Sequence, residues 1–341
     1  MPVATPQVGF VAWFPFADEA GLRRSVSLLD ELGVRHLRTG FSWADFERLD
    51  ADGPAWFDHV MHDVLGPRIR SGQIEVLFNF LYTPWAQARV KPGGERNTAS
   101  PPRRLRSFGA FVDRMLDRYG ELIGDVELLN EMDIPMEWDR EFDPQWHLLA
   151  RVVRHAAAVA RRRGRRVVLG GPTRAEPILL ERLAGSRWRG RDALRHVDIV
   201  GLHGFPGTWD SSVTHASTWR WRGWDEEVGL TRATLRQLGR PQSVWVTETG
   251  SSTYTDPSGE AQLAAFRATH AALAALAIER MYWYGLTNLE DHRPTINQVI
   301  SGESRESNPH SHFLGLAPPL CAHLRSHGPI LFGRQRCRQR A

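Results

Sequence analysis

Apolar runs of four to seven residues alternate along this chain with longer segments in which apolar residues recur every three to four positions. Short apolar runs are typical of strands buried on both faces, and the longer spacing is typical of amphipathic helices. The runs predict eight strands, at residues 7–12, 34–39, 74–80, 126–129, 167–170, 199–203, 243–247 and 280–284. The segments between them predict helices at 19–32, 56–71, 102–119, 144–163, 179–183, 224–238 and 259–277.

This alternation indicates parallel βαβ units. A length of 341 residues suits one (β/α)8 barrel, which needs about 250 residues plus insertions. A doubly wound open sheet is the alternative, but it usually has a glycine-rich turn after its first strand, and none stands there. We therefore predict an α/β fold, a single-domain (β/α)8 TIM barrel spanning residues 1–316.

The loops that follow the predicted strands are long and rich in Trp, Pro, Asp and Gly, whereas those that precede the strands are short. In a barrel, this asymmetry gathers aromatic and acidic side chains at the C-terminal face, where barrel active sites lie.

The formal net charge of +4 invites the hypothesis of a nucleic-acid partner, but its distribution argues against one. Residues 1–306 carry 38 basic against 39 acidic side chains, and the remaining residues hold five arginines and no acid. The arginine cluster at 161–166 lies where a helix is expected to end, and cations there favour the helix dipole. We expect no nucleic-acid partner.

Targeting, membrane and redox signals are lacking in the sequence. No apolar run approaches the roughly 20 residues needed to cross a bilayer, and the start has no basic segment followed by an apolar one, so a cytoplasmic location is expected. Cys321 and Cys337 lie far from any cluster with metal-ligand spacing. We expect no membrane partner, no metal and no cofactor.

Two glutamates, Glu131 and Glu248, close the apolar runs that begin with the fourth and seventh predicted strands. Glycoside hydrolysis needs two carboxyl groups, one to protonate the leaving oxygen and one to attack the anomeric carbon or activate water. Two carboxyls at one barrel mouth could approach the separation of about 5–5.5 Å found in retaining enzymes. The alternative for either residue is a helix N-terminal charge or an ion pair at the barrel mouth.

Around these glutamates the sequence resembles the clan A glycoside hydrolases, and more closely bacterial β-xylosidase-like barrel proteins. The resemblance runs to about Leu316. It is carried by Leu37-Arg-Thr-Gly-Phe-Ser-Trp43, Glu127-Leu-Leu-Asn-Glu131, Val200-Gly-Leu-His-Gly-Phe-Pro-Gly-Thr-Trp209, Val244-Trp-Val-Thr-Glu-Thr-Gly250 and Tyr282-Trp-Tyr-Gly-Leu286. It implies that Glu131 is the general acid/base, that Glu248 is the nucleophile and that Asn130 binds the sugar 2-hydroxyl.

The same resemblance implies that His203 bonds a substrate hydroxyl or the nucleophile, and that Trp283 forms the floor of the sugar site. A buried core histidine and an ordinary barrel-core tryptophan are the alternatives. Arg38, at the end of the second strand, is the expected cation for Glu248. Three tryptophans that follow strands are candidates for substrate contact or for loop packing: Trp43, Trp85 and Trp209.

Two features depart from the clan A pattern. Leu129 and Met132 flank Asn130-Glu131 where the clan commonly has Trp and Pro, and residues 317–341 show no amphipathic period and no acid. We expect those residues to form a basic tail that is altered or poorly ordered. The predicted function is a retaining β-glycosidase acting by double displacement on a carbohydrate or glycoside, and the resemblance points to a β-xylosidase-like enzyme. The alternative is a catalytically weak or inactive sugar-binding barrel, and the sugar and the oligomeric state are left open.

Overall fold

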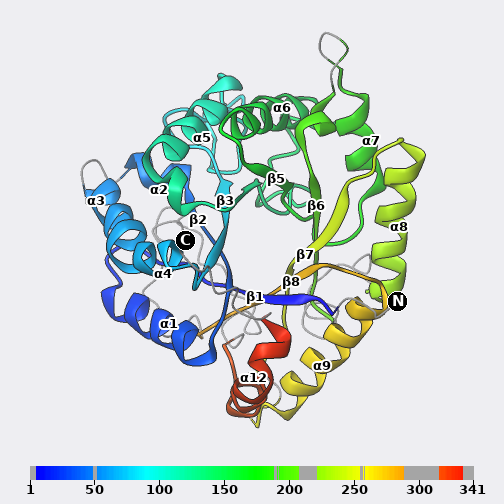
Figure 1. Cartoon of the computed structure of the whole chain (residues 1–341). Helices are drawn as coiled ribbons and strands as arrows, with labels where there is room; N and C mark the ends of the chain where they lie inside the picture. Colours follow the sequence, from blue (N-terminus) through cyan, green and yellow to red (C-terminus); the bar gives the residue numbers. More distant parts are fainter. Residues whose placement is uncertain are drawn as a thin grey trace, which may run out of the picture.

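Eight parallel strands close into a barrel in sequence order, as predicted, with helices around it (Figure 1). The computed structural model describes residues 5–48, 52–187, 190, 192–206, 221–253, 256, 258–287 and 315–332. The strands are β1 (Gln7–Val11), β2 (His36–Ser42), β3 (Glu75–Leu81), β4 (Asp125–Leu128), β5 (Arg166–Leu169), β6 (Ile199–Gly204), β7 (Ser243–Thr249) and β8 (Arg280–Tyr284). Each coincides with a predicted strand to within about two residues at most ends.

The outer layer consists of helices that run between successive strands. They are α1 (Glu19–Leu32), α2 (Trp43–Arg48), α3 (Asp52–Asp58), the π-helix η1 (His59–Leu65), α4 (Gly66–Arg70), α5 (Arg106–Tyr119), the 3-10 turn η2 (Gly120–Leu122), α6 (His147–Arg162), α7 (Pro177–Gly185), the 3-10 turn η3 (Ala193–His196), α8 (Trp224–Gln237), α9 (Glu260–Ala275) and α12 (Pro318–Leu331). The segment predicted as one helix at 56–71 is divided into α3, η1 and α4. Pro67, which has no backbone N–H, is the second residue of α4 and lies in its first turn, directly after the π-helix.

The bounds of α1 match the prediction because both of its ends are specified locally. The carboxylate of Asp18 accepts a hydrogen bond from the backbone N–H of Gly21 at 2.9 Å, which caps the first turn. Gly33 ends the helix in the left-handed region at φ 69°, where glycine carries no Cβ penalty.

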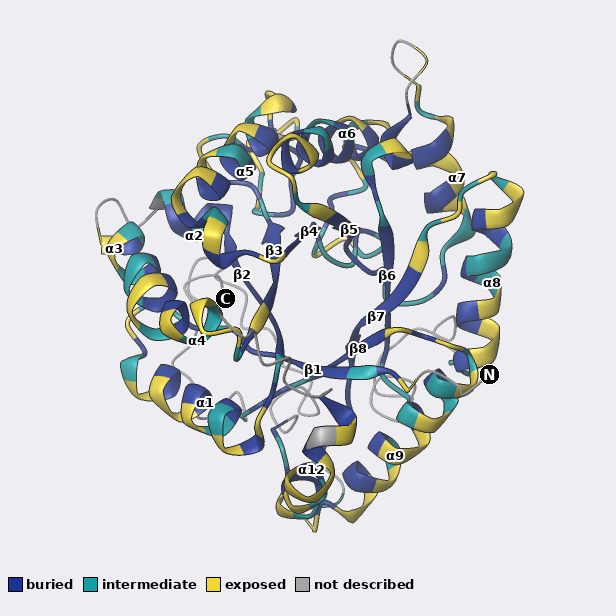
Figure 2. Cartoon of the chain, viewed as in Figure 1, coloured by how far each residue is buried: buried dark blue, intermediate teal, exposed yellow. Residues whose placement is uncertain are grey.

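The apolar core has two parts, separated by the strands. One lies between the strands and the helices, and Figure 2 shows the buried sides of the helices turned toward the barrel. The other is a small cluster to which several strands contribute alternate residues: Val11, Leu77, Val168, Ile199, Trp245 and Tyr282. Successive side chains in a strand point to opposite faces, so the second cluster fills the barrel interior.

The C-terminal segment differs from the prediction. Pro318–Leu331 forms α12, which packs against α1 and α9 (Figure 1). Leu320 and Leu324 are fully buried, and Phe332 packs on Phe10 of β1 with ring centroids 6.3 Å apart. The expectation of an altered or poorly ordered tail is therefore wrong for this helix, because apolar residues four and seven positions apart do form one buried face. Residues 333–341 lie outside the described part of the chain.

None of the helices in the described ranges combines the length and the apolar character that crossing a membrane requires.

Candidate active site

An extra residue in β7 brings Glu248 to the barrel mouth. Leu202 of β6 pairs with Val246, but the next residue, His203, pairs with Glu248 rather than with Thr247. The pairing of β7 with β8 shifts over the same stretch. A bulge of this kind breaks the strict alternation of side chains. As a result, Thr247 and Glu248, which a regular strand would turn to opposite faces, both contact His203.

Glu131 is turned toward the same point by an unusual backbone after β4. Leu129 and Glu131 have φ angles of 65° and 37°, in the left-handed region that costs a non-glycine residue roughly 1–3 kcal/mol. Two backbone bonds hold this segment: the N–H of Leu129 donates to the carbonyl of Phe80 at 2.8 Å, and the N–H of Glu131 donates to that of Gly171 at 2.9 Å. The strained backbone therefore serves to orient the carboxyl group of Glu131.

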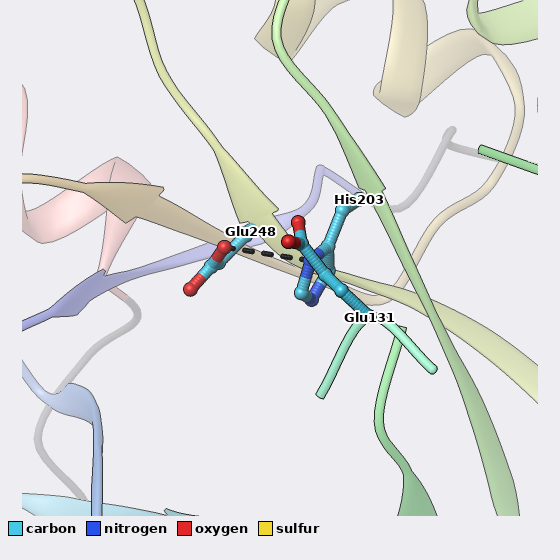
Figure 3. Close-up of side chains that lie close together, drawn as sticks. All are labelled: Glu131, His203 and Glu248. Atoms are coloured by element: carbon cyan, nitrogen blue, oxygen red, sulfur yellow. Dashed lines mark hydrogen bonds and ion pairs between the residues drawn. The ribbon is translucent and has the colours of Figure 1, made fainter. Parts of the chain in front are cut away.

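Figure 3 shows Glu131, His203 and Glu248 converging from three different strand ends. Nδ1 of His203 lies 3.0 Å from Oε1 of Glu131 and 3.4 Å from Oε2 of Glu248. The three facing atoms lie within 4.8 Å of one another. Gly171 leaves the room that the imidazole needs, since a Cβ at this position would stand 2.4 Å from Cδ2 of His203.

Arg38 holds the other side of the site. Its fully buried guanidinium donates from Nη1 to Oε1 of Glu248 at 2.6 Å, from Nε to Oε2 of Glu127 at 2.5 Å and from Nη2 to Oδ1 of Asn130 at 2.9 Å. Asn79 continues the network, because its amide donates to Glu127 at 3.0 Å and to the carbonyl of Leu129 at 2.8 Å. The predicted pairing of Arg38 with Glu248 is present, and the buried charge is satisfied on three sides.

The environments of the two carboxyls differ. Burial raises the pKa of Glu131 to about 7, and only the charge of Arg38, which is not its hydrogen-bond partner, opposes the rise. Burial also raises the pKa of Glu248, but His203 and Arg38 both oppose it and both contact the carboxylate directly. Glu131 is therefore suited to carry a proton near neutral pH, whereas Glu248 has a direct cationic partner that favours its ionised form.

Burial lowers the pKa of His203 to about 4, so its imidazole is neutral near pH 7. Nε2 lies 3.0 Å from the hydroxyl of Thr247, which can donate to it. Nδ1 faces two carboxyls, so the network favours the tautomer with the proton on Nδ1. A neutral, oriented imidazole then donates to the carboxyl groups without adding a charge.

Two further carboxyls lie in the loop after Glu131. Glu137 accepts a hydrogen bond from the hydroxyl of Tyr82 at 2.8 Å, and burial, followed by the charge of Glu131, raises its pKa to about 8. Asp133 accepts from the backbone N–H of Thr173 at 3.0 Å, and burial raises its pKa to about 6. Glu137 is close enough to Glu131 and Glu248 to count as part of the site.

Of the predicted site residues, the structure brings together Glu131, Glu248, Arg38, Asn130 and His203. Trp283 and Trp43 are not in the site. Trp283 stands between Tyr282 and Tyr284 in β8, so it faces the helices, where it packs edge-on against Phe266 of α9 at 5.2 Å. The prediction that Trp283 forms the floor of the sugar site is therefore wrong, and its position is explained by packing in the barrel core.

The predictions of substrate contact for the other tryptophans are answered one by one. Trp43 is only 1% exposed and stacks on Phe111 of α5 at 5.5 Å, so packing accounts for it and the expected substrate contact is corrected. Trp85, which follows β3, is 49% exposed, with the guanidinium of Arg96 4.9 Å from its ring centroid. The structure shows no contact between Trp85 and the carboxyl pair, and Trp209 lies outside the described residues.

Sequence reasoning missed several residues of the site. Tyr284 lies near the carboxyl pair, because burial and then the charge of Glu248 raise the pKa of the Tyr284 hydroxyl. Trp13, after β1, has its ring centroid 6.0 Å from Cζ of Arg38. Glu127 is fully buried within β4. Two signals could have found them: the alternation of β8, which turns Tyr284 inward, and a charged residue in the middle of an apolar run.

The cluster of Glu131, His203 and Glu248 also has the composition of a metal-binding group. The guanidinium of Arg38, however, already donates to Glu248 and would repel a divalent cation placed between the carboxyls. This charge argument supports the expectation of a metal-free site.

No protein-family model matches the chain, and no curated protein matches it. Its fold is similar to solved structures at low identity. A family 39 glycoside hydrolase from Bacteroides cellulosilyticus WH2 aligns with a TM-score of 0.63 and 14% identity, over 98% of this chain and 65% of that one. A GH39 β-xylosidase from Caulobacter crescentus aligns with a TM-score of 0.61 and 16% identity, over 95% and 71%. The β-glycosidase BGL167 aligns with a TM-score of 0.60 and 15% identity, over 100% and 99%. These likenesses establish the barrel fold.

Proposed function

We propose that the protein is a glycoside hydrolase, a retaining β-glycosidase that acts by double displacement. The observation that carries the proposal is the approach of the facing oxygens of Glu131 and Glu248 to within 4.8 Å. Retaining enzymes hold their carboxyls about 5–5.5 Å apart, whereas inverting enzymes leave roughly 6.5–9.5 Å for a water molecule. The structural likeness to proteins described as glycoside hydrolases supports the same reaction class.

In the first step, the carboxylate of Glu248 attacks the anomeric carbon, and the bond to the leaving oxygen breaks as Glu131 gives it a proton. In the second step, Glu131 takes a proton from water, and the water oxygen displaces Glu248 from the sugar. The raised pKa of Glu131 supplies the proton for the first step. The hydrogen bond from Arg38 favours the ionised form of Glu248 and holds its Oε1 in place.

Asn130 is the proposed partner of the sugar 2-hydroxyl. Its Oδ1 accepts from Arg38 at 2.9 Å, and its side chain also hydrogen-bonds Glu137. The amide is therefore oriented from two sides before substrate binds, which lowers the cost of placing it against a hydroxyl. The carboxyl of Glu137, close to the reacting pair, is proposed to bind a neighbouring sugar hydroxyl.

The departures from the clan A motif do not disturb this geometry. The indole of Trp146 donates to the carbonyl of Met132 at 3.1 Å, which anchors the loop where the clan commonly has proline. The β-xylosidase among the structural neighbours makes aryl xylosides the first substrates to test. Leu129 and Met132 are the observations that favour the second candidate, a sugar-binding barrel with weak or no turnover.

The test is hydrolysis of a panel of aryl β- and α-glycosides, with the configuration of the first-formed product read by proton NMR. We expect turnover of at least one β-glycoside with retention. Glu248→Ala should abolish it, and azide should restore turnover as a glycosyl azide of inverted configuration. Glu121→Gln, a change of a surface glutamate in η2, is the control. Binding of sugars without turnover would favour the second candidate, and an inverted water product would refute double displacement.

A further inference from the structure

A second concave site, separate from the carboxyl pair, lies between the N-terminal end of α5 and α6. Its volume is about 520 Å³. None of its ten lining residues is acidic, and six are arginines: Arg89, Arg103, Arg104, Arg106, Arg151 and Arg154. Arg89, Arg103 and Arg104 come from the segment between β3 and α5, and the others come from α5 and α6. These two helices lie side by side (Figure 1).

These arginines differ from several others on the surface, which have acidic partners. Three arginines elsewhere form ion pairs. Nε of Arg163 lies 2.7 Å from Oδ1 of Asp113, Nη2 of Arg166 lies 2.8 Å from Oδ2 of Asp125, and Nη1 of Arg161 lies 2.7 Å from Oδ1 of Asp198. Over the ranges that the structure describes, none of the six arginines of this site forms an ion pair. The site is therefore a local excess of positive charge, because six arginines line one hollow and no acidic residue lines it with them.

The inner part of the site is under-satisfied. Arg154 is only 8% exposed, and its described hydrogen bond is a long one, 3.5 Å from Nη1 to the carbonyl of Ser186. Nε of Arg89 is buried and has no partner among the described residues. The first turn of α5 has neither an acidic residue nor a side-chain cap. Burying cationic donors without partners is unfavourable, so the arrangement calls for a negatively charged ligand.

The charges also act on the histidine at the edge of the site. Burial, and then the charges of Arg154, Arg106 and Arg151, lowers the pKa of His155. Burial and Arg151 lower the pKa of Arg154 in the same way. An anion placed among these groups would reverse the effect on His155, which makes its titration a reporter of occupancy.

We propose that this site binds a multiply charged oxyanion, a phosphate or sulfate group, either as a free ion or as an ester on a larger ligand. A planar guanidinium can donate two parallel hydrogen bonds to two oxygens of such a group. Several arginines in a pocket without carboxylates can each bind the group in this way. The volume admits more than one such group, which favours a diphosphate or an ester over a single small ion.

The test is calorimetric titration of the full chain with inorganic pyrophosphate, and separately with a sulfated disaccharide, with sodium chloride at equal ionic strength as the reference. The site variant is R104Q/R151Q, which changes two exposed side chains. The control is R23Q/R24Q, which removes the same charge from exposed positions of α1. We expect saturable binding that the site variant weakens about tenfold or more, because hydrogen bonds to charged groups are strong. The control variant should stay within about twofold of the wild type, since it leaves those bonds in place.

NMR titration of the His155 ring gives a second readout, with the resonance assigned from His155→Gln. The pKa of His155 should rise when pyrophosphate is added to the wild type and should not move in R104Q/R151Q. Tighter binding of the sulfated disaccharide than of pyrophosphate would identify an ester as the ligand, and the reverse order would identify a free ion. Absence of saturation with both ligands, or equal weakening in both variants, would overturn the proposal.

Discussion

Arg38 and Glu248 form a buried ion pair at the centre of the barrel mouth, with Nη1 2.6 Å from Oε1 and side-chain exposures of 0% and 8%. The two residues stand 210 positions apart in the sequence, so only the closed barrel brings them together. The same guanidinium also binds Glu127 and Asn130. One side chain therefore positions the proposed nucleophile and the proposed partner of the sugar 2-hydroxyl.

Arg38→Lys should lower kcat/KM strongly and destabilise the fold, although the charge is retained. An ammonium group cannot make three diverging bonds in one plane, so Glu127 or Glu248 loses its partner. Breaking a buried pair costs about 3–5 kcal/mol, measurable by urea unfolding. Arg35→Lys, directly before β2 and with a side chain 17% exposed, is the control, and equal losses in the two variants would contradict the role given to Arg38.

The pH dependence of activity should report Glu131. Its pKa of about 7 predicts that kcat/KM falls as pH rises through 7, because the proton needed by the leaving group is lost. Glu131→Gln should remove this limb. The variant should also retain most of its kcat/KM on glycosides with very acidic leaving groups, whose departure needs no proton, whereas kcat should fall because the second step loses its base. A limb that persists unchanged in the variant would assign it to another group.

The raised pKa of Glu131 should also make the free energy of unfolding depend on pH. Its pKa is raised from 4.5 in the unfolded chain to about 7 in the folded one, so the folded state holds the proton more tightly. The stability that this contributes is fully present below pH 4.5 and is lost as pH rises through 7. The free energy of unfolding of Glu131→Gln, relative to that of the wild type, should therefore increase between pH 5 and pH 8. Urea unfolding across this range measures the difference.

Much of this site could be predicted from the sequence, because its determinants are local. A carboxyl directly after an apolar strand must lie at the mouth of a parallel barrel, which placed Glu131 and Glu248 correctly. The bulge in β7 could not be predicted, since the sequence 243–249 reads as a regular strand. Trp283 was misplaced by resemblance, although alternation with Tyr282 and Tyr284 would have turned it outward. The buried network of Glu127 and Asn79 depends on pairing between strands, which no local pattern shows.

The bulge gives a prediction with a matched control. Thr247→Val removes the hydroxyl that faces Nε2 of His203 at 3.0 Å, so the imidazole loses the contact that fixes its tautomer. We expect kcat to fall about 10- to 100-fold, which is the range found when the hydrogen-bond partner that orients a metal-ligating histidine is removed. Thr249→Val makes the same change at a buried hydroxyl without a described partner, and it should leave kcat nearly unchanged. Similar kcat values for the two variants would show that the hydroxyl does not orient His203.

The last helix should be required for stability, in contrast to the expectation from the sequence that residues 317–341 form an altered or poorly ordered tail. Leu324 of α12 is fully buried against the barrel, whereas Ile330 of the same helix is 69% exposed. Leu324→Ala should lower the free energy of unfolding by about 2–5 kcal/mol, because it removes buried methyl groups and leaves a cavity. Ile330→Ala should change it by less than about 0.5 kcal/mol, as surface substitutions usually do. Truncation after Leu316 should then lower the melting temperature sharply. An unchanged melting temperature, with equal effects of the two alanine substitutions, would show that α12 does not contribute to the barrel, since its buried face would then carry no stability.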